Sequence, residues 1–307
     1  MGVGRWPNLN PSDPIDMHPF WYWWQHLPEH INPVIFHIGS FRLQYYGLMY
    51  LVAFGITYGL ASYRLRSEPR WNLPQEHLQG LLTAMIIGLV IGARLGYVLF
   101  YNLEYYAHHP LEIVLPFSFS GGFHFTGIAG MSYHGGLICT LIGAWWYIRR
   151  NRLEFRKMAD LLIPCIPLAY TFGRLGNFIN GELWGRATTV PWGMYFPSGG
   201  PILRHPSQLY EAFSEGLLLF AVLWPLRKRI QTPGAMLAFY LIGYGTVRFI
   251  IEYFRQPDAQ FQKPGDPLGF VFLNFSMGQL LCSAMIAGGI LLYFLFRARD
   301  QRERASK

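Results

Sequence analysis

The sequence predicts an all-α integral membrane protein with seven transmembrane helices and a small cap on the outer face of the membrane. The chain of 307 residues is 52% hydrophobic and only 14% charged, whereas a soluble domain carries about 25% charged residues. Seven apolar stretches approach the roughly 20 residues that a spanning helix needs. We expect the spans near residues 44–63, 78–101, 129–148, 158–176, 207–226, 233–254 and 276–296.

Basic clusters between these stretches predict the orientation. With seven crossings, sixteen of the 25 Lys and Arg residues fall on one side, after the first, third, fifth and seventh spans. The positive-inside rule assigns that side to the cytoplasm, so we expect the N-terminus outside and the C-terminus in the cytoplasm. The sixteen are Arg64, Arg66, Arg70, Arg149, Arg150, Arg152, Arg156, Lys157, Arg227, Lys228, Arg229, Arg297, Arg299, Arg302, Arg304 and Lys307.

Composition divides the chain into four parts around the spans. Residues 1–43 form an N-terminal extension, and its aromatic run at residues 20–24 favours the lipid headgroup layer. Residues 44–176 hold the first four spans, and residues 207–307 hold the last three and a basic cytoplasmic tail. Residues 177–206 combine repeated Pro and Gly with two Trp residues, which predicts the outer-face cap.

Several function classes do not fit this composition. The net charge of +8 would suit nucleic acid, but the positive charges follow the loops and no nucleic-acid-binding motif is present. Cys139, Cys165 and Cys282 lie inside apolar segments, which indicates small core residues rather than a disulfide or metal set. We therefore expect neither a metal nor a cofactor. The absence of an internal repeat argues against an inverted-repeat transporter.

The most informative segment is residues 173–186, at the end of the fourth span. It holds two arginines, two asparagines and a glutamate interleaved with four glycines. Ionisable side chains at membrane depth are expensive, so they indicate a functional site by default. A lone arginine near a helix end would be explained as an anchor that reaches the interface. Five polar groups in one run cannot be explained in this way. The candidates in it are Arg174, Asn177, Asn180 and Glu182.

Other polar residues fall at the same predicted depth. Arg248 and Glu252 are four residues apart, so they share a helix face and can either pair with each other or share a ligand. His134 can be a proton-handling group or a buried structural histidine. The remaining residues at this depth are Tyr46, Arg94 and Glu211, of which Arg94 can simply tie helices together and Glu211 can bond to a neighbouring helix.

Two or three guanidiniums around a cavity favour an anion, and the planar fork of arginine matches phosphate bidentately. In the outer membrane layer the most economical anion is a phospholipid headgroup. The histidine and the carboxylates then supply candidates for general acid–base chemistry.

The motifs together resemble the prolipoprotein diacylglyceryl transferase family over nearly the whole chain from Pro33. Two parts depart from the common form, because residues 1–30 and the loop at residues 103–130 are longer. The motifs that carry the resemblance are residues 45–50, 92–102, 131–136, 173–186, 205–211 and 244–255.

The resemblance implies an enzyme of the bacterial inner membrane with its active site toward the outer leaflet. It implies transfer of the diacylglyceryl group of phosphatidylglycerol to the lipobox cysteine of a prolipoprotein, with release of glycerol phosphate. The thiol must become a thiolate, and positive charge must stabilise the departing phosphate. Besides these two substrates, membrane lipids are the expected partners, and nucleic acid is not one.

As hypotheses, Arg174 and Arg248 hold the phosphate, and His134 takes the thiol proton or orients the water that does. A carboxylate can equally be the base. Glu182 and Glu252 fix the arginines or assist proton transfer. Asn177 and Tyr46 hydrogen-bond the headgroup, and the further candidates for the lipid site are Asn180 and, in a supporting place, Glu211.

Three alternatives stay open. A transporter for anionic lipids or solutes would also line a cavity with arginines, but it should carry polar groups through the full membrane depth. An intramembrane protease lacks support, because no Gly-x-Ser-x-Gly or His-Glu-x-x-His motif is present. A non-catalytic lipid-binding protein would keep the arginines and have no need for His134.

Overall fold

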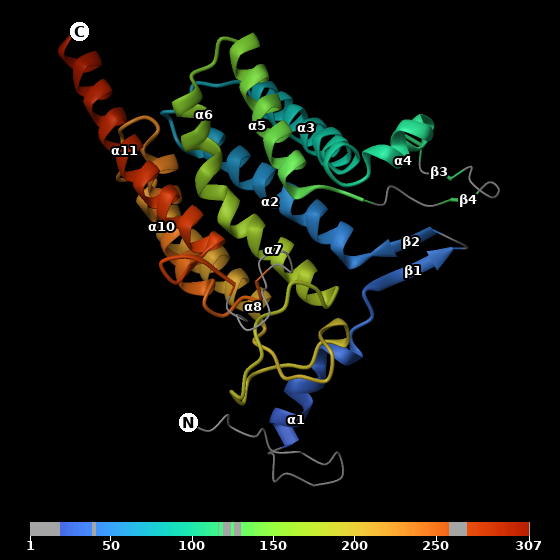
Figure 1. The fold of residues 1–307 in the computed structure, drawn as a ribbon. Coiled ribbons are helices and arrows are strands. Elements are labelled where there is room, and N and C mark those ends of the chain that lie inside the picture. The colour runs from blue at the N-terminus through green and yellow to red at the C-terminus, as the bar shows by residue number, and fades with distance from the viewer. Residues whose placement is uncertain are drawn as a thin grey trace.

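The computed structural model describes residues 19–38, 41–115, 117–118, 124–125, 130–257 and 269–306. The protein is mostly helical, and its long helices form a bundle with α1 (Pro19–His26) at one end and the C-terminal end of α11 (Met277–Ala305) at the other (Figure 1). Residues 1–18 of the N-terminal extension lie outside the described residues. So do residues 119–123 and 126–129 of the lengthened loop.

Each predicted span coincides with a helix or a helical run. In the part of the chain that the structure describes, three runs are long and apolar enough to cross a membrane by length and composition: Gln75–Tyr101, Ser207–Leu226 and Met277–Ala305. The spans correspond in order to α2 (Tyr45–Ser67), α3 (Gln75–Tyr101), α5 (Tyr133–Arg150), α6 (Phe155–Leu162) with α7 (Ile166–Ile179), α8 (Ser207–Glu211) with α9 (Leu219–Leu226), α10 (Ala235–Ile251) and α11.

Two of these runs are interrupted where the sequence predicted continuous helices. The fourth has a 3₁₀ turn at Ile163–Cys165, because Pro164 has no backbone N–H to continue the α-helical ladder. The fifth contains a π-helix at Ala212–Leu218. A π-helix is rare and is frequently found at functional sites. Both interruptions lie in segments whose apolar composition resembles that of an ordinary spanning helix.

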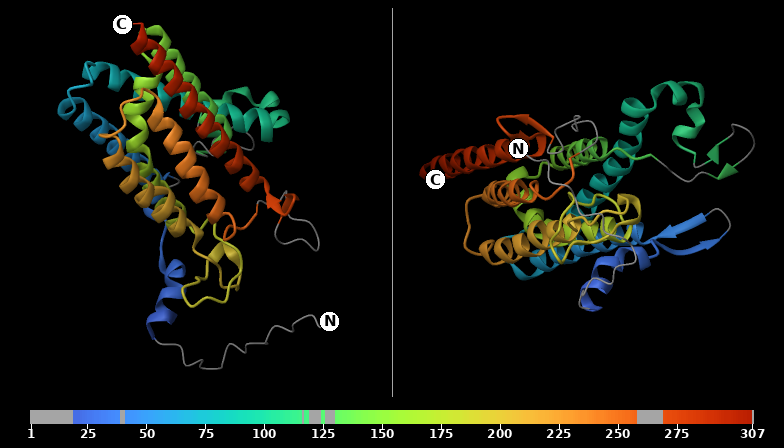
Figure 2. Two further views of the ribbon diagram at one scale, coloured as in Figure 1. Left: turned by 90° about the vertical axis from the view of Figure 1, so that its left-hand side faces the viewer. Right: turned by 60° about the horizontal axis from the view of Figure 1, so that its bottom comes forward.

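The expectation of purely helical structure is wrong for the short connections. Three two-stranded hairpins pair β1 (Val34–Ile38) with β2 (Phe41–Gln44), β3 (Phe117–Ser118) with β4 (His124–Phe125), and β5 (Phe270–Phe272) with β6 (Phe275–Ser276). Ile38 faces Phe41 across the first hairpin. Such short strands carry too few residues for a period-2 pattern to show in the sequence. The first two hairpins project sideways from the bundle, the second beyond α4 (Leu103–His108) (Figures 1 and 2). Short 3₁₀ turns at Leu27–His30, Pro110–Ile113 and Pro197–Gly199 complete the connections.

α3 and α5 pack together through glycines. Gly88, Gly92 and Gly96 are four residues apart, so they share one face of α3. A Cβ added to Gly135 of α5 would lie 2.8 Å from the Cα of Gly96 and closer still to the carbonyl oxygen of Gly92. Small residues at such an interface let two helix backbones approach closely, which is how helices associate in a membrane.

A buried ion network ties the helix ends at the basic end of the bundle. Arg64 has 0% exposure and donates to the carbonyl oxygen of Asp160 at 2.6 Å. Glu68 accepts from Nε of both Arg64 and Arg227 at 3.0 Å, and from the Trp71 indole at 2.8 Å. Burial alone would raise the pKa of Glu68, but its hydrogen bonds and the charge of Arg64 outweigh this and lower the pKa to about 2. The network joins α2 to α6 and α9.

Residues 177–206, predicted as a cap, fold around their own small core at the end of the bundle where α1 lies. Phe178, Met194 and Phe196 are at most 7% exposed. The helix α1 docks on this core, because Gln25 is buried and donates to a cap carbonyl at 2.9 Å, and Trp24 donates to another at 3.0 Å. The aromatic run predicted to lie in the headgroup layer is thus a helix held against residues 191–195; its placement in the headgroup layer stays a prediction.

The glycine interface predicts that Gly135→Ala destabilises the protein by about 2 kcal/mol or more, because its close neighbours are backbone atoms that cannot yield. Thermal unfolding in detergent measures this. Gly59→Ala on α2 is the matched control, since nothing lies within 4 Å of its added Cβ. Alanine there should be neutral or stabilise the helix by up to about 1 kcal/mol. Equal behaviour of the two variants would contradict close packing of α3 on α5.

Candidate active site

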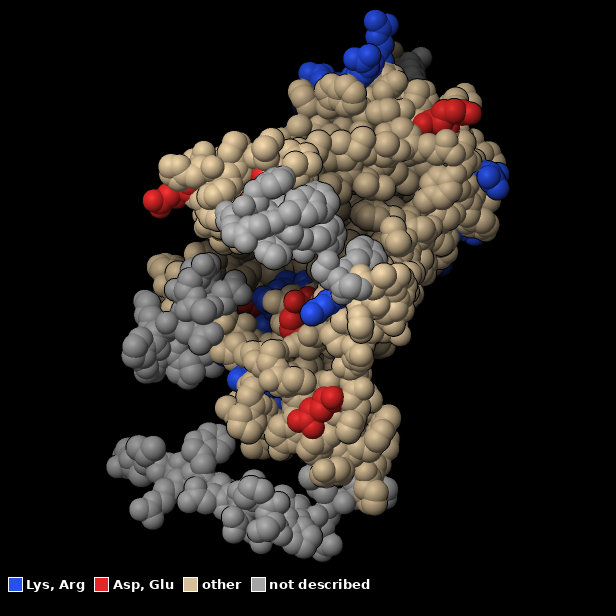
Figure 3. All heavy atoms as spheres, turned by 90° about the vertical axis from the view of Figure 1, so that its right-hand side faces the viewer, with Lys and Arg blue, Asp and Glu red and all other residues tan. Residues whose placement is uncertain are grey.

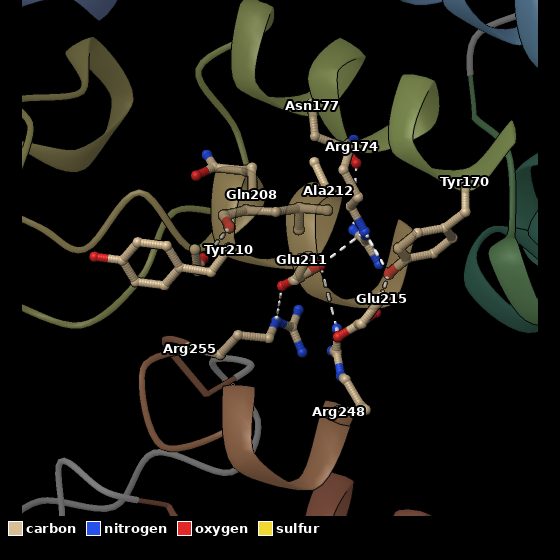
Figure 4. Close-up of polar contacts among 12 residues, drawn as sticks. Tyr170, Arg174, Asn177, Gln208, Tyr210, Glu211, Ala212, Glu215, Arg248 and Arg255 are labelled. Atoms are coloured by element: carbon tan, nitrogen blue, oxygen red, sulfur yellow. Dashed lines mark hydrogen bonds and ion pairs between the residues drawn. The ribbon is translucent and has the colours of Figure 1, made fainter. Parts of the chain in front are cut away.

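Three helical segments bring six ionisable side chains to one place, which we name the Arg–Glu cluster. Glu211 and Glu215 are four residues apart, and so are Arg248 and Glu252, so each pair points to one side of its helix. Figure 4 shows how they converge. The members are Arg174 on α7, Glu211 on α8, Glu215 in the π-helix, Arg248 on α10, and Glu252 and Arg255 after α10.

Glu211 is the centre of the cluster. Its Oε2 lies 2.7 Å from Nε of Arg174 and 3.2 Å from Nη1 of Arg248. Its Oε1 lies 3.4 Å from Nε of Arg255. Only 1% of the residue is exposed. From the sequence, Glu211 was expected in a supporting place, whereas the structure places it between the guanidinium of Arg174 and those of Arg248 and Arg255, which come from a distant part of the chain (Figure 4).

The other two carboxylates complete the charge balance. Nη1 of Arg248 donates to Oε1 of Glu215 at 3.3 Å, and Nε of Arg248 lies 3.6 Å from Oε2 of Glu252. Nη1 of Arg255 also lies 3.6 Å from that Glu252 oxygen. The predicted pairing of Arg248 with Glu252 is therefore present, but as the longer of its contacts.

Asn177 connects the cluster to Glu182. It accepts from Nη1 of Arg174 at 3.2 Å and donates to Oε1 of Glu182 at 2.8 Å. Glu182 was expected to fix an arginine. Among the described residues it has no ion pair with one, because it follows the end of α7 and reaches only as far as Asn177. Its influence on Arg174 passes through that amide.

Close backbone contacts hold the cap segment against the cluster. Gly185 donates to the carbonyl of His205 at 2.8 Å, and a Cβ on Gly185 would lie 2.5 Å from the carbonyl oxygen of Phe254. Only glycine fits there. Ser207 and Gln208 have 0% exposure and donate to the carbonyls of Leu183 and Glu182 at 3.0 and 2.6 Å. These contacts join the three motifs at residues 173–186, 205–211 and 244–255.

His205 takes part in this joint. Burial lowers the pKa of its imidazole below the usual value, which favours the neutral form. Its Nδ1 lies 3.1 Å from the Tyr210 hydroxyl, which also accepts from the Trp192 indole at 2.9 Å. Tyr210 points away from the Arg–Glu cluster (Figure 4).

The remaining predicted residues lie at different distances from the cluster. Tyr46 packs near Gly176, where an added Cβ would lie 3.2 Å from its ring, next to Asn177. The Oδ1 atom of Asn180 is buried and has no hydrogen-bond partner among the described residues. Arg94 donates to the carbonyls of Ile113 and Glu112 at 2.9 and 2.6 Å, which fits its helix-tying interpretation.

His134 is not joined to the cluster. It is exposed in the first turn of α5, two residues after the N-cap Ser132. Its ring lies 5.7 Å from that of Tyr133. Within the described part of the chain, no hydrogen bond or ion pair links His134 to any member of the Arg–Glu cluster. The interpretation of His134 as a buried structural histidine is wrong, since its side chain is exposed.

The charges of the Arg–Glu cluster balance. Three guanidiniums face three carboxylates in the Arg–Glu cluster. The side chains of Arg174, Arg248 and Arg255 are still 17%, 12% and 17% exposed. Basic and acidic atoms are visible together inside a hollow on one face of the protein (Figure 3). Nη2 of Arg174 and of Arg248 takes part in no hydrogen bond to a described residue, so an anion can reach these donors.

Three participants were missed by the sequence analysis: Tyr170, Glu215 and Arg255. Glu215 is an ionisable residue inside an apolar run, so the rule that singled out Arg174 also applied to it. Arg255 was counted with the loops. Tyr170 gave no signal, because a tyrosine in an apolar segment is ordinary and only the fold places its hydroxyl 2.6 Å from Nε of Arg174.

A bundle of apolar helices that buries such a cluster of arginines and glutamates at one end defines a membrane protein with a charged site inside its helical bundle. The chain belongs to the prolipoprotein diacylglyceryl transferase family, because the family model of that description matches residues 33–295. This match confirms the resemblance inferred from the motifs.

Relatives named phosphatidylglycerol–prolipoprotein diacylglyceryl transferase align over most of the chain. One from Chlorobaculum tepidum is 53% identical over 278 residues, which cover 89% of this chain and 93% of the relative. One from Idiomarina loihiensis is 43% identical over 272 residues, covering 88% and 94%. One from Polaromonas naphthalenivorans is 43% identical over 284 residues, covering 90% and 98%.

The central place of Glu211 predicts that Glu211→Gln lowers the free energy of unfolding by about 3 kcal/mol, because three guanidiniums lose a shared counter-charge. Added phosphatidylglycerol should raise the melting temperature of this variant more than that of the parent, since its phosphate replaces the lost anion. Thermal unfolding with and without the lipid measures both effects. Glu303→Gln is the control, since Glu303 pairs with an arginine on α11 at the opposite end of the bundle. An equal lipid effect in Glu211→Gln and the parent would show that the phosphate does not reach these arginines.

Proposed function

We propose that this chain carries out the reaction named for its relatives, using the Arg–Glu cluster as the phosphate site. It transfers the diacylglyceryl group of phosphatidylglycerol to the lipobox cysteine of a prolipoprotein. The single observation that carries the assignment of the site is the meeting of Arg174 and Arg248, from α7 and α10, with both Nη2 groups open to an anion. Family membership supports the reaction.

The chemistry is a displacement at an sp³ carbon. The cysteine sulfur forms a bond to the glyceryl carbon that bears the phosphate, the carbon–oxygen bond breaks, and its electron pair leaves with glycerol phosphate. The thiol proton must go to a base before or during attack, because the thiolate is the nucleophile. The leaving group gains negative charge, so arginines at the phosphate stabilise the transition state more than the bound lipid.

Asn177 and Tyr46 lie beside Arg174 and supply donors suited to the headgroup. Asn180 adds the buried and unpartnered Oδ1 atom, which can accept a hydroxyl hydrogen of the glycerol headgroup. Glu182 orients Asn177, and Glu252 orients Arg248 and Arg255. These roles place lipid recognition on α2, α7 and the segment after α10.

His134 is proposed as the base for the thiol proton. It is exposed at the start of α5, apart from the phosphate site, and this position suits a group that meets a second substrate. A carboxylate of the cluster is the alternative base. Each cluster carboxylate is already paired with a guanidinium, so its oxygens are less available to an incoming thiol.

We further propose seven membrane crossings in the bacterial inner membrane, with the Arg–Glu cluster toward the outer leaflet. The cap and α1 lie at the end of the bundle where the cluster is found (Figure 1). The basic residues that follow α5 and end α11 lie at the opposite end. The positive-inside rule assigns that opposite end to the cytoplasm.

The reaction is tested with purified protein in detergent, phosphatidylglycerol and a peptide that carries a lipobox cysteine. The parent should form a diacylglyceryl adduct on the peptide, seen by mass spectrometry, and release glycerol phosphate. Arg174→Ala should lower kcat/KM by about 10²- to 10³-fold, as expected for loss of a transition-state donor. Arg149→Ala, at the basic end of α5, should keep parental activity. No product from folded parent protein would refute the proposed reaction.

The role of His134 predicts that His134→Gln lowers kcat by about 10²-fold, because glutamine cannot accept the thiol proton. The limb of the pH–rate profile on which the parent's activity falls as the histidine becomes protonated should also disappear. The KM for phosphatidylglycerol should stay unchanged, since no hydrogen bond or ion pair among the described residues joins His134 to the cluster. A variant with parental rate and an unchanged pH profile would remove His134 from the chemistry.

A further inference from the structure

The hydrogen bonds of the two phosphate-site arginines do not go to Glu211. Nε of Arg174 donates to the Tyr170 hydroxyl at 2.6 Å, and Nη1 of Arg248 donates to Glu215 at 3.3 Å. Both carboxylate oxygens of Glu211 are buried without a hydrogen bond to any described residue, although they lie within ion-pair distance of the arginines. Glu211 is therefore held by charge, whereas the geometry of the arginines is set elsewhere.

Tyr170 and Glu215 join the two arginines in one continuous chain of hydrogen bonds. The Tyr170 hydroxyl accepts from Arg174 and donates to Oε2 of Glu215 at 2.5 Å. The other oxygen of Glu215 accepts from Arg248. Figure 4 shows this bridge beside Glu211, with Tyr170 on the same helix as Arg174. Hydrogen bonds that involve an ionised partner are short and strong.

The backbone around the bridge is built for close approach. Thr171, next to Tyr170, donates to the carbonyl of Ala212 at 3.2 Å, the first residue of the π-helix. A Cβ on Gly216, next to Glu215, would collide with the Thr171 hydroxyl. The π-helix thus lies directly against α7 at the level of the bridge, and Glu215 is 1% exposed. This packing leaves little freedom for Tyr170 and Glu215.

We propose that Tyr170 and Glu215 are positioning residues, which hold the Arg174 and Arg248 guanidiniums at a fixed separation for phosphate binding. Glu211 is the counter-charge that the phosphate competes with or displaces. This inference rests on the proposed function, because it assigns a lipid phosphate to the two arginines.

The physical reason is that charge attraction sets only how close two groups lie, whereas hydrogen bonds also set their orientation. Coulomb attraction to Glu211 holds the arginines near each other but does not orient their forks, and the incoming phosphate carries the same charge as Glu211. The Tyr170–Glu215 bridge keeps its hydrogen bonds when the phosphate arrives, because it uses Nε of Arg174 and Nη1 of Arg248 and leaves both Nη2 groups free. Preorganised donors are worth more because they need no rearrangement during reaction.

Tyr170→Phe tests the bridge, because it removes one hydroxyl and keeps the ring. Tyr240→Phe is the matched control, since Tyr240 is a partly buried tyrosine that packs against the apolar cluster around Leu219 and Met236. In Tyr170→Phe we expect the KM for phosphatidylglycerol to rise about tenfold, as for loss of a charged hydrogen bond. The KM for the lipobox peptide should not change. Tyr240→Phe should behave like the parent in both.

Binding without turnover separates this inference from the proposed reaction. The rise in melting temperature caused by phosphatidylglycerol should be smaller in Tyr170→Phe than in the parent or Tyr240→Phe, whether or not any product forms. Equal lipid shifts in the two phenylalanine variants would overturn the positioning role. Equal changes in the KM of both substrates would overturn it too, because they indicate a general structural defect.

A double-mutant cycle tests whether the two residues act as one unit. Glu215→Gln keeps the shape of the side chain and removes its charge. Members of one hydrogen-bond network are not additive, so the combined variant should be no more than slightly worse than the worse single variant in KM for phosphatidylglycerol. Effects that multiply in the combined variant would overturn the bridge. If Glu215→Gln does not fold, the comparison of Tyr170→Phe with Tyr240→Phe still decides.

Discussion

The cost of burying charge is the constraint on which this site depends. Glu211, Glu215 and Glu252 have side chains that are at most 8% exposed, and a buried charge without a partner is strongly destabilising. Three arginines from two separate parts of the chain must therefore meet three glutamates at one place. This requirement brings α7, the α8 run and α10 together at one end of the bundle. The buried cluster also requires small residues beside it. A Cβ on Gly278 of α11 would lie 2.5 Å from the Glu252 carboxylate.

A cluster with balanced charge can still favour an anionic product. The carboxylates neutralise the arginines in the resting protein, so the hollow is not a strongly positive surface that would hold any anion. Phosphatidylglycerol brings a phosphodiester with one negative charge, whereas the departing glycerol phosphate is a monoester that gains more. Interactions that strengthen as charge develops lower the barrier, while uniform attraction only tightens binding. A site with balanced charge is suited to favour the more negative leaving group over the bound lipid.

The proposed phosphate site and the proposed base lie on different groups of packed helices. Arg174 and Arg248 lie on α7 and α10, which pack around the π-helix and its neighbours. His134 lies at the start of α5, which packs on α3 through glycines. Under the proposed roles, the lipid phosphate and the thiol proton would be handled by separate parts of the bundle. The buried network around Glu68 joins α2 to α6 and α9 at the basic end of the bundle.

The helical segments and the Arg–Glu motifs followed from the sequence, because long apolar runs and charges inside them have few physical explanations. The family followed from the resemblance of the motifs. Local patterns could not show the π-helix, the hairpins or the central place of Glu211, since each depends on contacts between residues distant in the chain. The sequence by itself determined which charged groups had to be buried. Only the tertiary structure decided how they pair, because a guanidinium chooses its partner by distance and direction. That is why Tyr170, which carries no charge and gave no pattern, could be recognised only in the fold.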